Sequence, residues 1–364
     1  MSIEVLWFMI VALMFAVYVV LDGFNFGTGL IYLFVARTDA ERQLVLKAIG
    51  PVWKGNEVWL VAGGGLLFLA FPKAFAAGFS GFYLALILVL WFLIMRGLSI
   101  ALRSHLHNPL WRAFWDAIFA VASLLLAIGF GAALGNVIRG VPLTADGYFF
   151  TAFWTTFAPG LEPGILDWFT VLVGVLTAVI LTVHGANYLT IKTNEAVHSR
   201  ASQIADAGAW LVVPLAIMAI LALPFVQPAL RHSYDAHPAG YVLPLIAAIA
   251  LLTAQYFRRR RRDGAAFFSW SLFILGMLGS VAWGLFPNLL IAAQDPAYSL
   301  TIYNTAASPY GLRVGLVWSA SASASSSPTP SSSTGVSGGK WSESRSRKAV
   351  NKLFCRLQLS HAGA

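Results

Sequence analysis

Four ionisable side chains lie within or beside long apolar stretches of the sequence. Asp22 and Arg96 lie deep inside two of these stretches, and Lys54 and Glu57 lie at the start of another, three residues apart and therefore on one helix face. Charges at membrane depth are costly unless they are paired or hydrated, so such residues are candidates for function. With Trp53, they could form a hydrated proton path or the polar wall of a binding site. Two acids and two bases could equally pair as a structural cluster that fixes helix order.

The stretch around Lys54 also allows a simpler interpretation. Trp53 and Trp59 flank Lys54 at the mouth of an apolar run. Indole rings commonly lie at the membrane interface, and a lysine there can extend its ammonium group to the surface. An interfacial anchor therefore remains an alternative to a working site.

Two glycines and one histidine are candidates for contacts inside the membrane. Gly23 and Gly27, four residues apart, would let a second helix or a bound molecule approach the backbone closely. His184 lies well inside an apolar stretch, whereas the other histidines fall in loops or in the tail. Histidine is a common haem ligand, but we expect a membrane haem to need a second histidine on a facing helix. We therefore expect His184 to form a hydrogen bond, and we expect no metal site; the single Cys355 excludes an internal disulfide.

The composition is that of an integral membrane protein. Of 364 residues, 58% are hydrophobic and only 11% are charged, against about 25% charged in soluble domains. Mean hydropathy is +0.74. The net charge of +9 does not indicate nucleic-acid binding, because lysine and arginine in membrane proteins usually set topology. We predict an all-α, polytopic transmembrane helical bundle.

Apolar runs long enough to cross a bilayer predict eight helices. They cover residues 5–36, 58–75, 79–102, 114–138, 166–191, 209–226, 241–257 and 267–291. The loops on one side carry twelve basic residues and those on the other side carry three. The basic side should face the cytoplasm, which places the N-terminus outside.

The loops divide the chain into segments. Residues 1–138 and 166–291 are predicted to form two four-helix bundles, separated by an external loop over residues 139–165. Residues 292–317 should form an external loop and the remnant of a last helix, and residues 318–364 a disordered Ser/Pro-rich basic tail. The run Arg258–Arg262 could bind nucleic acid or anionic lipid, although a stop-transfer signal explains it as well.

Several motifs together resemble a known family. Residues 50–59 read GPVWKGNEVW, followed by GGG at 63–65 and AFP at 70–72. Further runs are DGFNFG at 22–27, FSGFY at 79–83 and LTIYN at 300–304. In their order along the chain, these motifs resemble those of subunit II of cytochrome bd-type quinol oxidases, in the cyanide-insensitive-like branch. The resemblance covers about residues 5–317 and implies that a ninth helix of the family is lost.

The resemblance implies a function and a set of partners. The complex would oxidise quinol near the outer face of the bacterial cytoplasmic membrane and reduce oxygen to water with cytoplasmic protons. Haem b and haem d, or haem b alone, would be held by subunit I, and this chain would ligate none of them. Subunit I, quinol, membrane lipids and a small single-helix subunit are the implied partners. With a quinone as partner, Gly23, Gly27 and His184 are candidate quinone or helix contacts, and the charged cluster could form a polar wall for a quinone head group.

The sequence departs from the family pattern at three positions. Lys54 and Asn25 stand where the family usually has aspartate, and Ala101 stands where an acid usually precedes the arginine at the end of the third span. None of these side chains relays protons as a carboxylate does, which questions proton conduction through this subunit. The alternatives are a scaffold subunit without a proton path and a secondary transporter, which would require an inverted repeat of broken helices that the sequence does not show.

Overall fold

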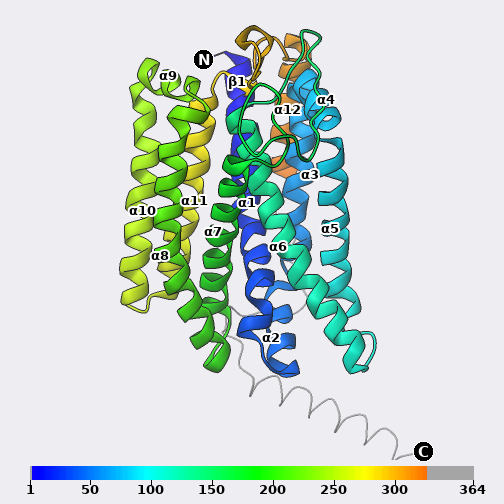
Figure 1. Cartoon of the computed structure of the whole chain (residues 1–364). Coiled ribbons are helices and arrows are strands. Elements are labelled where there is room, and N and C mark those ends of the chain that lie inside the picture. Colours follow the sequence, from blue (N-terminus) through cyan, green and yellow to red (C-terminus); the bar gives the residue numbers. More distant parts are fainter. Residues whose placement is uncertain (1, 326–364) are drawn as a thin grey trace, which may run out of the picture.

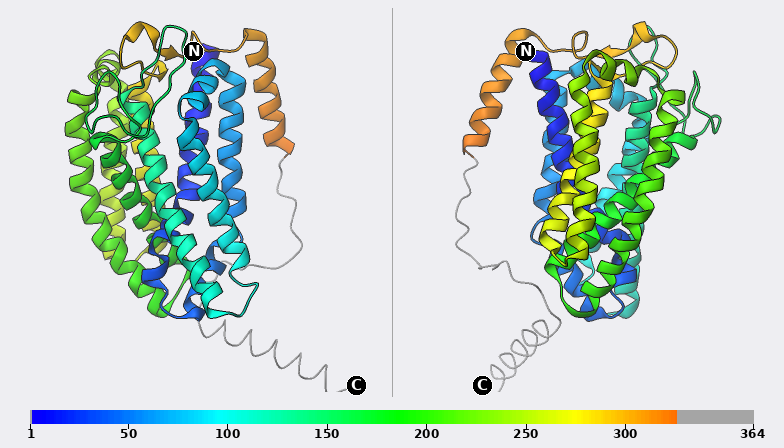
Figure 2. Two further views of the ribbon diagram at one scale, coloured as in Figure 1. Left: turned by 45° about the vertical axis from the view of Figure 1, so that its right-hand side comes forward. Right: turned by 90° about the vertical axis from the view of Figure 1, so that its left-hand side faces the viewer.

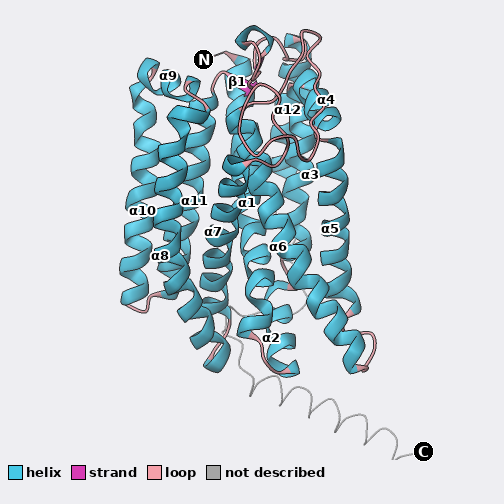
Figure 3. Ribbon diagram, in the orientation of Figure 1, coloured by secondary structure: helices cyan, strands magenta, loops and turns pink. Residues whose placement is uncertain are grey.

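The computed structural model describes residues 2–325, and the tail predicted for residues 326–364 lies outside the described part. The described residues form an almost entirely helical protein (Figures 1 and 3). Its α-helices are α1 (Ile3–Val35), α2 (Asp39–Ile49), α3 (Trp53–Ala70), α4 (Pro72–Gly81), α5 (Tyr83–Leu102), α6 (Pro109–Arg139), α7 (Trp168–Lys192), α8 (Glu195–Val226), α9 (Ala229–Ala236), α10 (Val242–Arg259), α11 (Asp263–Leu285) and α12 (Pro309–Ser325). Two short 3-10 helices, η1 (Pro238–Tyr241) and η2 (Pro296–Tyr298), and two antiparallel strands, β1 (Asn288–Leu290) and β2 (Leu300–Thr301), complete the described elements.

Seven of the described helices are long and apolar enough to cross a membrane: α1, α5, α6, α7, α8, α11, and α10 together with η1. The sequence predicts eight, and the eighth corresponds to α3. This helix forms, but its first turns carry Lys54, Asn56 and Glu57, which make it less apolar. The predicted second span, to residue 75, is too long: α3 ends at Ala70 and Pro72 begins α4, since proline favours the first turn of a helix.

Helix α1 lies at the centre of the bundle (Figure 1). It packs against α3 and α6 of the first predicted group and against α7 and α11 of the second. Helices α6 and α7 also pack along each other across the predicted division. The largest apolar core contains residues from α1, α2, α6, α7, α8, α10 and α11. Residues of both predicted groups therefore contribute to this core.

The two ends of the bundle differ. At one end, here called the loop end, the irregular segment 140–167 lies near the β1–β2 pair, and Val141 bridges to Ala292 (Figure 1). At the opposite end, here called the α2 end, α2 begins with a capping box formed by Thr38 and Glu41. The sequence analysis did not predict α2 as a helix.

Helix α12 lies at the edge of the bundle beside α1 and α3 (Figure 2). The Trp7 indole donates a hydrogen bond to the Leu312 carbonyl at 3.1 Å. The sequence predicts a remnant that stops near residue 317 and disorder from residue 318 onward, but the helix continues to Ser325. This correction has a simple physical basis, because the alternating Ser and Ala residues there are compatible with a helix.

Candidate functional site

Arg96 forms the centre of a buried ion cluster that joins three helices. From α5, its Nη2 atom donates to Asp22 Oδ1 on α1 at 3.0 Å, and its Nη1 atom lies 3.4 Å from Asp22 Oδ2. The same Nη1 donates to Glu57 Oε1 on α3 at 3.0 Å. Arg96 and Asp22 are both 0% exposed. Asp22 and Arg96 therefore pair with each other, and Glu57 adds a second acid to the cluster.

Neighbouring side chains hold this cluster in place. The Asn25 amide donates to Asp22 Oδ1 at 2.9 Å, one helical turn along α1. The Arg96 guanidinium lies over the Phe26 ring, 4.3 Å from its centroid. Asn56 on α3 donates to the Leu21 carbonyl on α1 at 2.6 Å. Polar groups from α3 and α5 are thus fastened to a single stretch of α1.

Lys54 is not part of the cluster. Its side chain is exposed, and its Nζ atom lies 5.5 Å from the centre of the Trp53 ring. The possible Lys54–Glu57 pair does not form, because Glu57 is bound by Arg96 instead. Trp53 is half-buried and faces Gly97 on α5. The exposure of Lys54 and its position beside the Trp53 ring fit an interfacial anchor better than a member of the buried ion cluster.

Gly23 and Gly27 are helix contacts. A Cβ atom added at Gly27 would lie 1.7 Å from the Leu181 carbonyl oxygen and 2.7 Å from the Gly185 nitrogen, both on α7. One added at Gly23 would meet the Leu181 side chain at 2.7 Å. Helix α7 therefore occupies the space that the sequence analysis left open to either a helix or a quinone.

We expect Gly27→Ala to destabilise the protein, since the new methyl group would push α1 away from the α7 backbone. Overpacking of this kind typically costs about 1–3 kcal/mol of unfolding free energy. The matched control is Gly64→Ala on α3, where an added Cβ atom meets nothing within 4 Å. Thermal unfolding of the purified protein in detergent should show a lower melting temperature for Gly27→Ala only; equal shifts would contradict this packing.

A second ion network, at the α2 end, was missed by the sequence analysis. Asp116 on α6 is 1% exposed and accepts hydrogen bonds from Tyr32 on α1 at 2.6 Å, Arg42 on α2 at 2.9 Å and Arg103 at 2.5 Å. Arg103 also donates to Asp39 at 2.7 Å. The sequence did contain an indication of it, because Asp116 lies just inside the predicted span 114–138 and an acid there needs a partner.

Glu41 extends this end of the molecule to α8. Arg200 donates to its two carboxylate oxygens at 2.9 and 3.1 Å, and the amides of Arg37 and Thr38 donate at 2.7 and 3.0 Å. Burial alone would raise the pKa of Glu41, but these hydrogen bonds outweigh it and lower the pKa to about 2. Helix α2 is thus attached to α6 through Asp116 and to α8 through Glu41.

A pH dependence of stability follows from Glu41. Because its folded pKa lies below the ordinary value of 4.5, its stabilising effect is complete above about pH 4.5 and is lost as the pH falls toward 2. Melting temperatures between about pH 6 and pH 3 should therefore fall more steeply for the native chain than for Glu41→Gln. The exposed Glu162→Gln variant should keep the native slope. Parallel slopes for the native chain and Glu41→Gln would refute this role.

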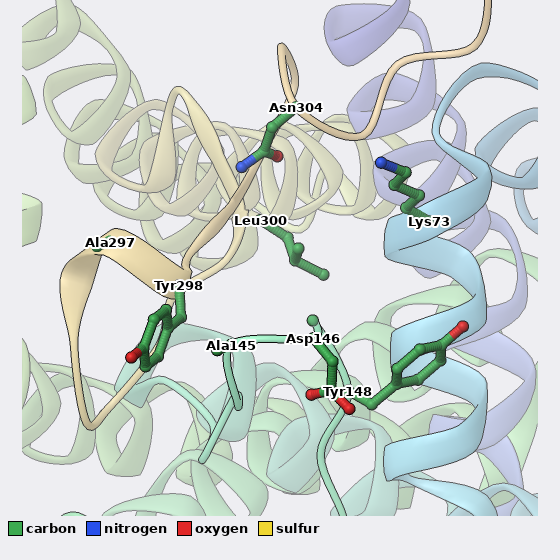
Figure 4. A pocket seen from close by; sticks show the side chains of 9 residues that line it. Lys73, Ala145, Asp146, Tyr148, Ala297, Tyr298, Leu300 and Asn304 are labelled. Atoms are coloured by element: carbon green, nitrogen blue, oxygen red, sulfur yellow. The ribbon is translucent and has the colours of Figure 1, made fainter.

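A hollow of about 310 Å³ lies at the loop end, between α4 and the loops (Figure 4). Lys73, Asp146, Tyr148, Tyr298 and Asn304 are among its lining residues. Asp146 accepts a hydrogen bond from Thr144, and Asn304 bonds to the backbone at residues 299 and 301. The loops themselves use these polar groups, so we assign no ligand to the hollow.

Comparison with known proteins decides the family. The family model described as cytochrome bd terminal oxidase subunit II matches residues 3–324. The chain belongs to this family. A probable cytochrome oxidase subunit 2 of Haemophilus influenzae is 30% identical, over 86% of this chain and 88% of the relative. Cytochrome bd ubiquinol oxidase subunit 2 of Bacillus subtilis is 29% identical, over 86% and 89%. Cytochrome bd-I ubiquinol oxidase subunit 2 of Escherichia coli K12 is 28% identical, over 86% and 88%.

The fold agrees with the family. The structure of bd oxidase from Geobacillus thermodenitrificans superposes with a TM-score of 0.71 at 18% identity, covering 88% of this chain and 94% of that one. The protein is therefore a multi-pass membrane subunit of a bd-type quinol:oxygen oxidoreductase, and membership of this family implies a complex with a subunit I and haem. The secondary-transporter alternative is rejected by family membership.

The bd oxidase family implies haem, and His184 is the histidine of this chain that the sequence places inside the membrane. His184 is 0% exposed, and its Nε2 atom lies 2.8 Å from the Val20 carbonyl oxygen. Phe267 stacks on its ring with centroids 4.9 Å apart and planes 4° from parallel. Within the described residues no group of three or more His, Cys, Asp or Glu side chains could hold a metal. The Nδ1 atom has no hydrogen-bond partner among the described residues, but His184 is completely enclosed by protein, so a haem could not reach it without displacing its neighbours.

Proposed function

We propose that this chain is the subunit II of a quinol oxidase that ligates no haem itself. Haem b and haem d, or haem b alone, would be held by subunit I, and quinol would be oxidised by the assembled complex. The observation that supports this assignment is His184, whose Nε2 is engaged with Val20 and whose ring is covered by Phe267. Membrane lipids and a small single-helix subunit are further proposed partners.

We also propose an orientation in the bacterial cytoplasmic membrane. The α2 end carries most of the basic loop residues, including Arg37, Lys47, Lys192 and the run Arg258–Arg262. By the positive-inside rule this end faces the cytoplasm and the N-terminus lies outside. Protons for oxygen reduction would then be taken up from the α2 side, and the loop end would face outward.

Within the complex, the Arg96 cluster would fix the positions of α1, α3 and α5 and would not conduct protons. Arginine keeps its proton in proteins, and here it binds both oxygens of Asp22 as well as Glu57. A proton relayed through Asp22 would have to break this pair inside the membrane. Asn25, which donates to Asp22, offers an amide where the family usually has a carboxylate.

This chain would therefore act as a scaffold subunit without a proton path, within a complex that is an enzyme. Two candidate relay positions, Lys54 and Ala101, carry no carboxylate, and Lys54 is exposed. The ion pairs join helices that are separate in sequence, which is a structural role. Proton delivery would then run through subunit I.

Turnover of Lys54 variants tests this proposal. We expect Lys54→Asp and Lys54→Met to leave quinol-dependent oxygen consumption by the purified complex unchanged at each pH, because Lys54 touches neither Glu57 nor Asp22. A faster Lys54→Asp enzyme beside an unchanged Lys54→Met enzyme would show that a proton path through this subunit exists and is limited by Lys54. A collapse of activity in both variants would make Lys54 a working residue and would also contradict the proposal.

A further inference from the structure

The turn between α10 and α11 holds a residue other than glycine in the left-handed backbone conformation. The Arg262 amide donates to the Phe257 carbonyl at 2.9 Å, and the Arg261 amide donates to the Arg258 carbonyl at 2.9 Å. These two bonds form a Schellman motif, whose left-handed position is usually occupied by glycine. Here that position is Arg261, with φ of 55°. Residues with a side chain are disfavoured in this conformation, so Arg261 occupies a position that glycine would adopt with less strain.

The five arginines of the turn divide into two kinds. Arg258 is 6% exposed in its side chain and points inward, where it bonds to Asp206 at 2.7 Å, Asn187 at 2.5 Å and the Ser202 carbonyl at 2.8 Å. The remaining four, Arg259–Arg262, are exposed and form no salt bridge with an acid in the described part of the chain. The following acid, Asp263, lies 4.0 Å from His198.

The turn lies nearer the middle of the bundle than the lowest ends of α6 and α8 do (Figure 1). One to two turns further along the helices, toward the middle of the bundle, α10 exposes Leu252 and Tyr256, and α11 exposes Phe268. The Arg260 guanidinium lies 5.5 Å from the centre of the Tyr256 ring. Exposed apolar side chains thus adjoin exposed guanidinium groups, which suits a molecule with acyl chains and an anionic head.

We propose that the turn Arg259–Arg262 binds an anionic phospholipid of the leaflet at the α2 end. Guanidinium groups bind phosphate oxygens with paired hydrogen bonds, and each basic residue near an anionic surface adds favourable energy. A stop-transfer signal accounts for the positive charge alone, whereas an anionic phospholipid would use both the guanidinium groups and the exposed Leu252, Tyr256 and Phe268 beside them. The proposal specifies the lipid partner proposed above and is independent of the proposed roles of haem and protons.

The test measures binding of phosphatidylglycerol to the purified complex, by native mass spectrometry and by thermal shift in neutral detergent. Arg261→Gly should bind the lipid about fivefold more weakly, while its melting temperature without anionic lipid stays equal or rises because the left-handed strain is removed. Arg259→Gln with Arg261→Gln should weaken binding about 30-fold.

Two controls separate a site from a general charge effect. Glu195 also has a left-handed backbone, with φ of 60°, and Glu195→Gly should change stability without weakening lipid binding. Arg37→Gln removes an exposed cation at the same end and should leave affinity unchanged. The proposal is overturned if Arg37→Gln weakens binding as much as Arg261→Gly, if the double variant binds as the native chain does, or if inorganic phosphate alone protects as well as phosphatidylglycerol.

Discussion

Replacing Arg96 by leucine is expected to remove most of the assembled complex from the membrane. The substitution leaves Asp22 fully buried without its cationic partner, although the Asn25 amide still donates to it, and it frees Glu57 as well. Removing one partner of a buried ion pair costs about 3–5 kcal/mol, a large share of the roughly 5–15 kcal/mol by which proteins are stable. The amount of complex recovered from membranes, measured on native gels, reports this loss.

Two further variants test the origin of that effect. Glu57→Gln should lower the yield only slightly, because Glu57 is 30% exposed in its side chain and an amide oxygen can still accept from Arg96. Arg96→Leu combined with Asp22→Leu should recover part of the yield, since no unpaired buried charge remains at that position. Equal losses of complex for Glu57→Gln and Arg96→Leu would contradict the difference in burial between Glu57 and the Arg96–Asp22 pair.

Replacing Asp116 by leucine should have a comparable effect at the α2 end. Asp116 accepts from Tyr32, Arg42 and Arg103, and the loss of its carboxylate leaves Arg103 buried with Asp39 as its remaining acidic partner. We expect a loss of about 3–5 kcal/mol in unfolding free energy. Limited proteolysis near residues 36–38 should also accelerate, because α2 loses its attachment to α6.

The matched control for Asp116 is Asp235→Leu. Asp235 lies 3.6 Å from Arg231 four residues earlier on α9, and both side chains are more than half exposed. Exposed pairs contribute about 1 kcal/mol or less, so this variant should keep the native melting temperature within a few degrees. If Asp116→Leu were as stable as Asp235→Leu, the network at the α2 end would not hold the helices together.

The pairing of Arg96 shows what the sequence could predict and what it could not. Depth along an apolar run identified Asp22 and Arg96, because charges there must find partners. The partner of Glu57 was not predictable from spacing, since a lysine three residues away on the same helix competes with a guanidinium on another helix. Arg96 presents several donors and can serve two acids at once, so the tertiary contact prevails.

The helices, too, were only partly predictable from the sequence. Apolar runs located the spanning helices, but their ends depended on local chemistry: Pro72 starts a new helix, and α8 begins at Glu195, well before the predicted residue 209. Helix α2 escaped prediction because it is short and mostly polar, and its capping box and contacts with α6 and α8 stabilise it. The spacing of Gly23 and Gly27 predicted a close approach to α1, but it could not show that α7 is the element that approaches.

The most direct test of the central claim is the reduced-minus-oxidised absorption spectrum of this chain, purified with and without the partner that assembles with it. We predict haem bands in the assembled complex, no haem bands in the chain alone, and an unchanged spectrum of the complex with His184→Ala. A haem spectrum that follows this chain in the absence of any partner, and disappears on His184→Ala, would contradict the assignment of the haems to subunit I.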